Sequence, residues 1–383
     1  MSVCDLCNKV FERKSGLEQH KKRKNPCTKS PNKAISLFSG CGGDTLGLER
    51  AGITVVAFLE LKKTFIESHK ENFPNSKLIS DSTGKITDIT KIETSQFENI
   101  KADIVFAGFP CQGFSNAGKK QIADPRNQLY QQFIRVVKQV RPRFIIGENV
   151  QGLDRMKSGP SLSDPLMIDL IKNDFAKIGY KLIHKIHEAT NFGVPQKRKR
   201  LIIIGWDQEQ VSDTTNLWEE IEANGHKNKM VTLRSFITNS MEGAYQIPTA
   251  AIPANFEKFA LPISQEACPS GKPHPYIILK ANAKLLSCKK RDSGIHSEII
   301  DLDAPSKTII CTYGHCPRLL VGLRKPDGTS YLRTLLPDEL KQIQGFPADY
   351  KLMGNQSEQI TQIGNAVPPP MIEAIALTLR SKL

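Results

Sequence analysis

One cysteine of the sequence stands where a predicted strand passes into a tight loop. The residues DIVFA at 103–107 are typical of a short buried strand, and GFPCQGFSNAG follows at 108–118. Cys111 is flanked there by Pro110 and by glycines, which hold it at the end of the strand. A thiol in this position suits a nucleophile better than a core filler. The alternative is a buried structural thiol.

A carboxyl group and two guanidinium groups follow at other predicted strand ends. Gly147-Glu148-Asn149-Val150 closes one strand, which places the carboxyl of Glu148 in the same crevice as Cys111. Arg198 and Arg200 precede another strand, and alternate residues of an extended segment point to the same side. Both arginines could therefore face the crevice. The alternative is a phosphate-binding or solvated basic run.

A glycine loop indicates a cofactor site. The sequence FSGCGGDTLGLERAG at 38–52 follows a short apolar run, and its glycines allow close approach of the backbone to a ligand. It matches neither a P-loop nor a dinucleotide-binding motif. Glu60 ends the next predicted strand, where a carboxylate can accept hydrogen bonds from ribose hydroxyls. We expect a cofactor that carries a nucleoside, and the alternative for Glu60 is a surface carboxylate.

The N-terminal residues have the spacing of a zinc site. Cys4, Cys7, His20 and Cys27 follow the pattern C-x2-C-x12-H-x6-C, which can meet at one tetrahedral Zn²⁺. The segment resembles a ββα zinc finger, although a cysteine after six residues replaces the usual second histidine. The alternative is accidental spacing. Cys311, His315 and Cys316 resemble only half a metal site, and ordinary packing is favoured for them.

Charge and cysteine content restrict the class of protein. The nine cysteines are an odd number in a chain without an apolar secretory signal, so we expect no disulfide framework and an intracellular location, nuclear if the host is eukaryotic. No apolar run is long enough to span a bilayer, so no membrane partner is expected. The net charge of +14 favours nucleic acid as a partner. The basic run at 21–24 could contact phosphates, act as a nuclear address or form a solvated face.

These residues must be positioned by an α/β fold. Apolar runs predict strands at 35–38, 54–59, 103–107, 144–146 and 201–204, and helical periodicity lies between them. Such alternation predicts a mostly parallel sheet covered on both faces. The pattern decays after residue 206, where the chain becomes polar and irregular. The predicted domains are a zinc finger at 1–30, a catalytic domain at 31–206, a variable recognition domain at 207–330, and a return to the catalytic domain at 331–383.

The motifs, taken in order, resemble those of the DNA (cytosine-5) methyltransferase family. They are Phe-x-Gly-x-Gly-Gly, Pro-Cys-Gln, Glu-Asn-Val, Gln-x-Arg-x-Arg, Arg333-x-Leu-x-Pro-x-Glu339, Gly345-Phe346-Pro347 and Gly364-Asn365-Ala366-Val367. The resemblance spans residues 34–383. It implies a Rossmann-like sheet that binds S-adenosylmethionine, with a smaller irregular target-recognition domain. Ser36, where aspartate is common, and Leu61, where a larger side chain is frequent, depart from the pattern.

The resemblance also implies roles for individual residues. Cys111 would be the nucleophile, Glu148 would protonate the ring nitrogen, and Arg200 would contact the base carbonyl. Arg198 would lie close by, and Gln112 and Ser115 would hold the flipped base and its phosphate. Residues implied at the cofactor site are Phe38, Gly40, Gly43, Glu60, Asp88, Ile89, Pro110, Leu129, Asn365 and Val367, with Asp81 as the alternative to Asp88.

The implied reaction is methylation of C5 of a cytosine flipped out of a specific duplex DNA sequence, through a covalent intermediate on Cys111. The partners expected are double-stranded DNA, S-adenosylmethionine and Zn²⁺ in the finger, and the chain is expected to act as a monomer. A companion restriction endonuclease is a further partner if the methylation protects DNA, and the alternative is that it marks a genome for regulation. Two other functions stay open. One is methylation of cytosine in transfer RNA, and the other is DNA binding without catalysis on the same scaffold.

Overall fold

A computed structural model of the chain describes most of its residues. The described residues are 2–3, 10–22, 31–110, 129–159, 161, 163–226, 231–249, 252, 256–273, 277–279, 286–288, 298–315 and 317–383. Cys111, Gln112 and Ser115 lie outside them, as do Cys4, Cys7, Cys27 and Cys316. The roles predicted for the six of them other than Cys316 are therefore discussed below only as proposals.

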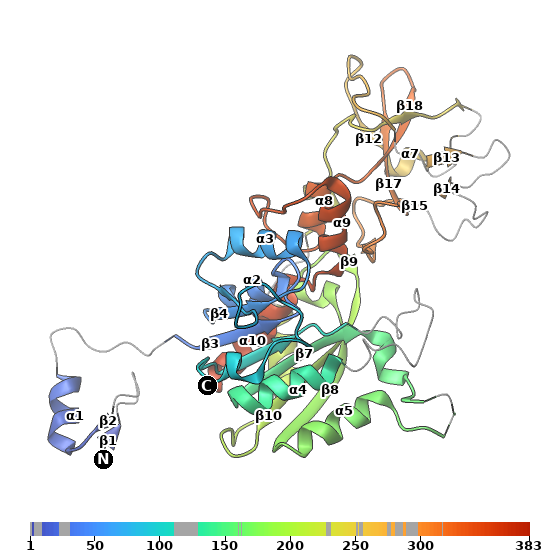
Figure 1. The fold of residues 1–383 in the computed structure, drawn as a ribbon. Helices are drawn as coiled ribbons and strands as arrows, with labels where there is room; N and C mark the ends of the chain where they lie inside the picture. The colour runs from blue at the N-terminus through green and yellow to red at the C-terminus, as the bar shows by residue number, and fades with distance from the viewer. Residues whose placement is uncertain are drawn as a thin grey trace.

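A seven-stranded sheet forms the centre of the larger part of the molecule (Figure 1). Its strand order is β5-β4-β3-β6-β7-β10-β8. The first five strands of this order are parallel, and β10 is antiparallel to both β7 and β8. The strands are β3 (Lys33–Leu37), β4 (Thr54–Leu59), β5 (Lys77–Leu78), β6 (Ile104–Ala107), β7 (Phe144–Val150), β8 (Tyr180–Glu188) and β10 (Lys199–Asp207). The predicted, mostly parallel sheet is confirmed.

Helices cover both faces of this sheet. α4 (Leu129–Val140) and α5 (Met167–Ala176) pack on one face, where Phe133, Ile171 and Phe175 are buried. α2 (Gly43–Arg50), α6 (Leu217–His226) and α10 (Pro369–Ser381) cover the other, where Ile221 and Ile375 are buried. α3 (Lys63–Asn72) follows β4. Because α6 belongs to this packing, the domain built on the large sheet extends beyond the predicted boundary at residue 206.

A smaller sheet lies in the predicted recognition domain. It pairs β11 (Tyr245–Gln246), β18 (Ser330–Thr334), β17 (Leu319–Arg324) and β12 (Leu261–Pro262), with β15 (Glu298–Ile299) also on β17. A separate pair is β13 (Ile277–Leu279) with β14 (Leu286–Cys288). α7 (Phe256–Phe259) packs on β17, where Phe256 and Leu320 are buried together. The sheet ends at Thr334, four residues past the predicted boundary at 330.

The two sheets are joined where the chain leaves the domain of the large sheet and returns to it. β9 (Gln196–Lys197) pairs in parallel with β16 (Ser306–Lys307). α8 (Pro337–Ile343) and α9 (Gln356–Asn365) lie between the two sheets in Figure 1. Short 3-10 helices connect other elements: η1 (Thr94–Phe97), η4 (Gln151–Arg155), η5 (Ala189–Phe192) and η6 (Leu233–Ser235).

The N-terminal segment has a ββα arrangement. β1 (Ser2–Val3) pairs antiparallel with β2 (Val10–Phe11), and α1 (Lys14–Lys21) follows. His20 lies near the end of α1 and is 6% exposed. Within the described residues no group of three or more His, Cys, Asp or Glu side chains could hold a metal ion. Three of the four predicted zinc ligands lie outside those residues.

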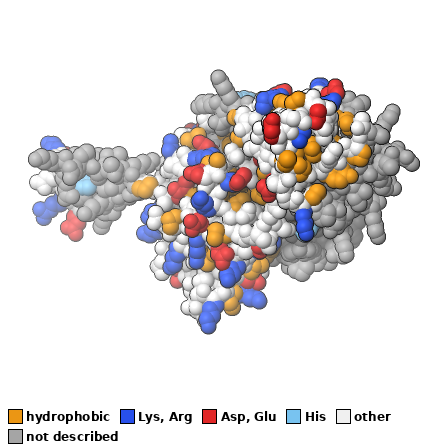
Figure 2. Space-filling view, turned by 90° about the horizontal axis from the view of Figure 1, so that it is seen from above, with side chains coloured by type: hydrophobic (Ala, Val, Ile, Leu, Met, Phe, Trp, Pro, Cys, Tyr) orange, Lys and Arg blue, Asp and Glu red, His pale blue; other side chains and the backbone are white. Residues whose placement is uncertain are grey.

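Two surface properties bear on the possible partners. None of the helices in the described part of the chain is both long enough and apolar enough to cross a bilayer. Figure 2 shows lysine and arginine side chains interspersed with aspartate and glutamate on the face it displays. The net charge of +14 is therefore not gathered into one basic patch among the described residues of that face.

Candidate active site

The end of β7 lies beside the segment that leads to Cys111. Asn149 is buried, and its Nδ2 donates to the carbonyl of Phe109 at 3.0 Å. A Cβ atom built on Gly108 would lie 3.7 Å from Oε2 of Glu148. The carboxyl of Glu148 and the residues just before Cys111 therefore share the carboxyl edge of the parallel strands, as the sequence predicted.

Glu148 and Arg200 form an ion pair across two strands. In the antiparallel pairing of β7 and β10, Glu148 is opposite Ile202 and Arg200 is opposite Val150, so the pair are diagonal neighbours on one face. The Nε of Arg200 lies 2.8 Å from Oε1 of Glu148, and each side chain is 14% exposed. Burial lowers the pKa of Arg200, and Glu148 opposes that shift. The arginine thus fixes the direction of the carboxyl group.

Arg198 has different surroundings from Arg200. Its side chain is 1% exposed, and its two terminal nitrogens donate to the carbonyls of Ile309, Gly364 and Ala366, each at 2.9 Å. Burial lowers the pKa of this guanidinium well below its usual range. Alternation along the segment predicted that both arginines face the crevice. The break between β9 and β10 at residue 198 instead directs Arg198 toward the C-terminal block.

The glycine loop (residues 38–43) lies at the ends of β3 and β4. Phe38 has a φ of 57°, a conformation that non-glycine residues rarely adopt and that is frequent at functional sites. A Cβ on Gly43 would lie 2.5 Å from the carbonyl oxygen of Val367, so only glycine fits here. Glu60 accepts hydrogen bonds from the backbone N–H groups of Gly40, Leu61 and Lys62, each at 2.9 Å. The loop, Glu60 and Val367 are therefore brought together.

The other predicted cofactor residues occupy varied positions. Asp88 is half-buried, and its Oδ1 accepts from the backbone and side chain of Thr90 at 3.0 and 2.7 Å. Ile89 is 3% exposed and packs in the core beside α4. The alternative, Asp81, uses its carboxylate within its own turn, where it accepts from Thr83, Lys85 and Ile86. Both carboxylates thus accept hydrogen bonds within their own turns, and the choice of Asp88 over Asp81 stays a prediction. Pro110 and Leu129 are half-buried, and Asn365 is exposed.

Sequence reasoning missed a buried polar network behind the glycine loop. Asp44 is 2% exposed and accepts hydrogen bonds from the hydroxyls of Ser36 and, at 3.4 Å, Ser39. Thr45 lies 3.0 Å from Nε2 of His69, whose ring stacks on Phe58. Burial raises the pKa of Asp44 to about 7 and lowers that of His69 to about 3. The sequence held one signal of this network: Asp44 comes directly after Gly42-Gly43, and Ser36 interrupts the preceding apolar strand.

Comparison with known proteins agrees with this geometry. The family model described as C-5 cytosine-specific DNA methylase matches residues 32–381. The chain belongs to this family. It is 30% identical to the Type II methyltransferase M1.HphI of Haemophilus parahaemolyticus, over 89% of this chain and 85% of that protein. It is 28% identical to M.NgoPII of Neisseria gonorrhoeae, over 94% and 98% of the two chains.

Solved structures share the fold of this methylase. A putative DNA modification methyltransferase encoded in an E. coli prophage superimposes with a TM-score of 0.62 and 23% identity, over 92% of this chain and 99% of that one. The Dnmt2 methyltransferase of S. pombe superimposes with a TM-score of 0.61 and 17% identity, over 91% of this chain and 99% of that one. The predicted methyltransferase fold and DNA (cytosine-5) methyltransferase activity are confirmed, and S-adenosylmethionine is the methyl donor expected of this family.

Proposed function

We propose that Cys111, Glu148 and Arg200 carry out the methylation of cytosine in this enzyme. The observation that carries the proposal is the Glu148–Arg200 ion pair beside the segment that leads to Cys111. The pair would present a fixed carboxyl to one edge of the base and a guanidinium to its carbonyl oxygen. This arrangement suits a reaction in which a ring nitrogen gains a proton while the ring is attacked.

The proposed chemistry begins at C6 of the base. The Cys111 thiolate forms a bond to C6, the C5–C6 π electrons make C5 nucleophilic, and Glu148, after taking up a proton, gives that proton to N3. S-adenosylmethionine, when bound, would supply an electrophilic methyl group to C5, and its sulfonium sulfur would keep the electrons of the broken S–CH3 bond and leave as a thioether. A base then removes the proton from C5, the bond between C6 and sulfur breaks to release the thiolate, and N3 returns its proton. Because a stacked base cannot reach Cys111, the nucleotide must first be flipped out of the duplex.

Other predicted site residues would assist this reaction. Gln112 and Ser115 would hold the flipped nucleotide and its phosphate. Arg198 would act as a positioning residue, because its donors already bind the carbonyls of Ile309, Gly364 and Ala366. The proposed cofactor site comprises Phe38, Gly40, Gly43, Glu60, Asp88, Ile89, Pro110, Leu129, Asn365 and Val367. A side chain at position 43 would clash with the carbonyl oxygen of Val367, so this position requires glycine. A glycine here would also let the backbone approach the donor closely.

The direct test uses a labelled methyl donor with either duplex DNA or transfer RNA. We expect label in DNA, and label only in RNA would favour the rival function. Cys111→Ser should abolish turnover, whereas a DNA-binding protein without catalysis would show none in the unmodified chain. DNA with fluorine at C5 of the target cytosine should trap a covalent adduct, because fluorine cannot leave as the proton does. Cys111→Ser should form no adduct.

We further propose that the methylation belongs to a restriction-modification system. The similar proteins M1.HphI and M.NgoPII are named Type II methyltransferases, and enzymes of this type protect DNA from a companion endonuclease. The target would be read within residues 207–330. Bisulfite sequencing of a plasmid from expressing cells should show methylation confined to one short sequence. Methylation at scattered, unrelated cytosines would contradict the proposal.

The N-terminal segment is proposed as a structural zinc finger with ligands Cys4, Cys7, His20 and Cys27. Two observations support it: β1 and β2 pair antiparallel before α1, and His20 is buried near the end of that helix. Elemental analysis of the full chain should find one zinc per chain, and Cys7→Ser should lose it while methylation persists. Equal zinc content in both proteins would exclude this site.

A further inference from the structure

A buried tyrosine from the C-terminal part of the chain reaches the glycine loop. The hydroxyl of Tyr350 donates to the carbonyl of Cys41, and the tyrosine is 5% exposed. Burial raises the pKa of this phenol well above its usual range, so the hydroxyl keeps its proton and remains a donor. The ring packs on Phe346 at 4.6 Å between centroids. Tyr350 therefore holds the peptide that directly precedes Gly42 and Gly43.

The contact leaves the glycine loop little freedom. A Cβ on Gly42 would lie 2.9 Å from the Tyr350 hydroxyl oxygen and 2.7 Å from the ring of Phe73. Gly42 also has a φ of 93°, which a side chain rarely permits. The loop is thus pressed against Tyr350 on one side and against Val367 at Gly43 on the other. A shift of Tyr350 would move the backbone of the loop.

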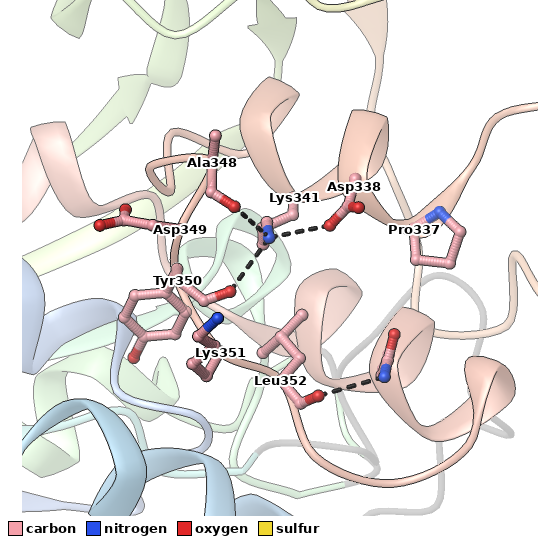
Figure 3. Close-up of a pocket in the computed structure, with 9 residues that line it drawn as sticks. Pro337, Asp338, Lys341, Ala348, Asp349, Tyr350, Lys351 and Leu352 are labelled. Carbon is pink, nitrogen blue, oxygen red and sulfur yellow. Dashed lines mark hydrogen bonds and ion pairs between the residues drawn. The ribbon is translucent and has the colours of Figure 1, made fainter. Parts of the chain in front are cut away.

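Tyr350 is itself held by a buried ammonium group. Lys341 of α8 is 5% exposed, and its Nζ donates to the carbonyls of Ala348 and Tyr350 at 2.8 and 3.0 Å. It also pairs with Asp338 at 2.8 Å. Lys341 lines a cavity of about 340 Å³. Figure 3 shows its ammonium between these three partners. The backbone of Tyr350 is therefore tied to α8.

The neighbouring residues are tied to α3 on the other side. The side chain of Asn72 donates to the carbonyl of Lys351 at 2.8 Å and accepts from its N–H at 3.0 Å. The hydroxyl of Ser68 accepts from the N–H of Met353 at 2.8 Å. Residues 346–353 thus form a brace between α8 and α3, and Tyr350 is the point at which this brace contacts the glycine loop.

We propose that Tyr350 is a positioning residue for S-adenosylmethionine binding: through its hydrogen bond to Cys41, the brace at 346–353 holds the glycine loop in the shape that accepts the donor. The inference rests on the proposed function, in which the glycine loop lines the cofactor site. Lys341 acts one step further away, by fixing the backbone of Tyr350. Neither side chain needs to touch the donor or the base.

Tyr350→Phe tests this role, because it keeps the ring and removes only the hydroxyl. We expect the Kd for S-adenosylmethionine, measured by calorimetry on the full chain, to rise about fivefold to tenfold, the effect of losing one buried hydrogen bond. KM for the donor should rise equally. At saturating donor, kcat should stay within about twofold, since the reacting groups are untouched. The Kd for DNA should not change.

Tyr313→Phe is a control at a second buried tyrosine. The hydroxyl of Tyr313 donates to the carbonyl of Leu319 at 2.6 Å and also accepts from the N–H of Leu335 at 2.9 Å, but it lies beside the recognition sheet. This variant should lose stability without loss of donor affinity. If Tyr350→Phe lowers the melting temperature yet binds the donor as tightly as the unmodified chain, its role is structural only and the inference fails.

Lys341→Met provides a second, independent variant. It should weaken donor binding in the same direction, and its effect should be less than additive with that of Tyr350→Phe, because both act through the hydrogen bond to Cys41. If the effects of the two substitutions on donor affinity are fully additive, or if Lys341→Met binds the donor normally, then Lys341 does not act through Tyr350 and the brace does not position the glycine loop. An unmodified chain that binds no S-adenosylmethionine would instead overturn the proposed function, so the two failures are distinguishable.

Discussion

Glu148 and Arg200 illustrate how sheet register creates a reactive pair from residues far apart in sequence. Their strands are antiparallel, and the pairing of Glu148 with Ile202 makes Arg200 its diagonal neighbour. A register shift of one residue would turn Arg200 to the opposite face of the sheet. The ion pair at 2.8 Å is therefore a consequence of strand pairing as well as of side-chain chemistry.

Glu148→Gln should lower kcat by about 10² to 10⁴, because the amide cannot deliver the proton to N3. The donor Kd and the melting temperature should change little, since the amide oxygen can still accept from Arg200. Single-turnover methylation of duplex DNA measures the effect. Glu188→Gln is the control: Glu188 lies on β8, 3.8 Å from Lys199, and has no proposed chemical role. A Glu148→Gln enzyme with more than half of normal kcat would contradict the assignment.

Asp44 should make stability depend on pH in a way that Asp44→Asn does not. Burial raises its folded-state pKa from 3.8 to about 7, so the folded protein holds a proton that the unfolded chain has lost between these values. The associated stability is fully present below about pH 4 and is lost as pH rises through 7. His69, with a pKa lowered to about 3, contributes the opposite slope below its ordinary value of 6.5.

Subtracting the variant isolates Asp44 from His69. The unfolding free energy of the unmodified chain minus that of Asp44→Asn should fall as pH rises from 5 to 8 and then level off. Urea denaturation at four pH values would measure it. A difference that is constant over this range would show that Asp44 ionises normally in the folded protein.

At the scale of elements, the approach of α2 and α10 depends on a residue without a side chain. A Cβ on Gly47 would lie 2.6 Å from the carbonyl oxygen of Pro369, 2.7 Å from Cβ of Ile372 and 2.9 Å from the backbone nitrogen of Glu373. Two of these three atoms belong to the backbone of α10, which cannot move aside as a flexible side chain can. The helices therefore pack closely enough to bring the C-terminal block against the glycine loop.

Gly47→Ala should destabilise the protein by about 1–3 kcal/mol, the usual cost of overpacking. This sign is opposite to that expected in an exposed helix, where the same change stabilises by about 1 kcal/mol. Thermal unfolding measures the effect, and Arg50→Ala, at an exposed position of the same helix, serves as the control. A rise in melting temperature for Gly47→Ala would show that α10 can move away at little cost.

The strands that could be predicted from the sequence are the ones buried on both faces of the sheet. β4 was predicted with its observed bounds, and β3, β6, β7 and β10 were located, because strands buried on both faces are continuous apolar runs. β8 was not predicted. It lies at the edge of the sheet, and in its sequence YKLIHKIHE apolar residues are mixed with lysine, histidine and glutamate, so it contains no continuous apolar run. Its pairing with β10 makes the last part of the sheet antiparallel. Residue types placed Glu148 and Arg200 together, but Tyr350 and Asp44 depend on contacts that no local pattern records.

At the scale of the whole molecule, charge is distributed unevenly along the chain. Residues 1–33 hold nine lysines and arginines against three acidic residues, whereas basic and acidic side chains are interspersed on the face shown in Figure 2. Affinity for DNA that comes from binding phosphates falls with salt, by an amount set by how many phosphates the protein neutralises. Salt dependence can therefore decide whether the basic run at 21–24 touches DNA or forms a solvated face.

Replacing Lys21, Lys22, Arg23 and Lys24 by glutamine in the full chain should make the plot of log K against log salt shallower, by about one for each phosphate that the variant no longer neutralises. The methylated sequence, read by bisulfite sequencing, should stay the same, because binding to phosphate carries no base information. Lys63→Gln with Lys70→Gln on α3, both exposed, controls for the removal of charge alone. If the quadruple variant has an unchanged slope of log K against log salt, the run at 21–24 forms a solvated face. If its methylation pattern changes, the N-terminal segment reads bases directly.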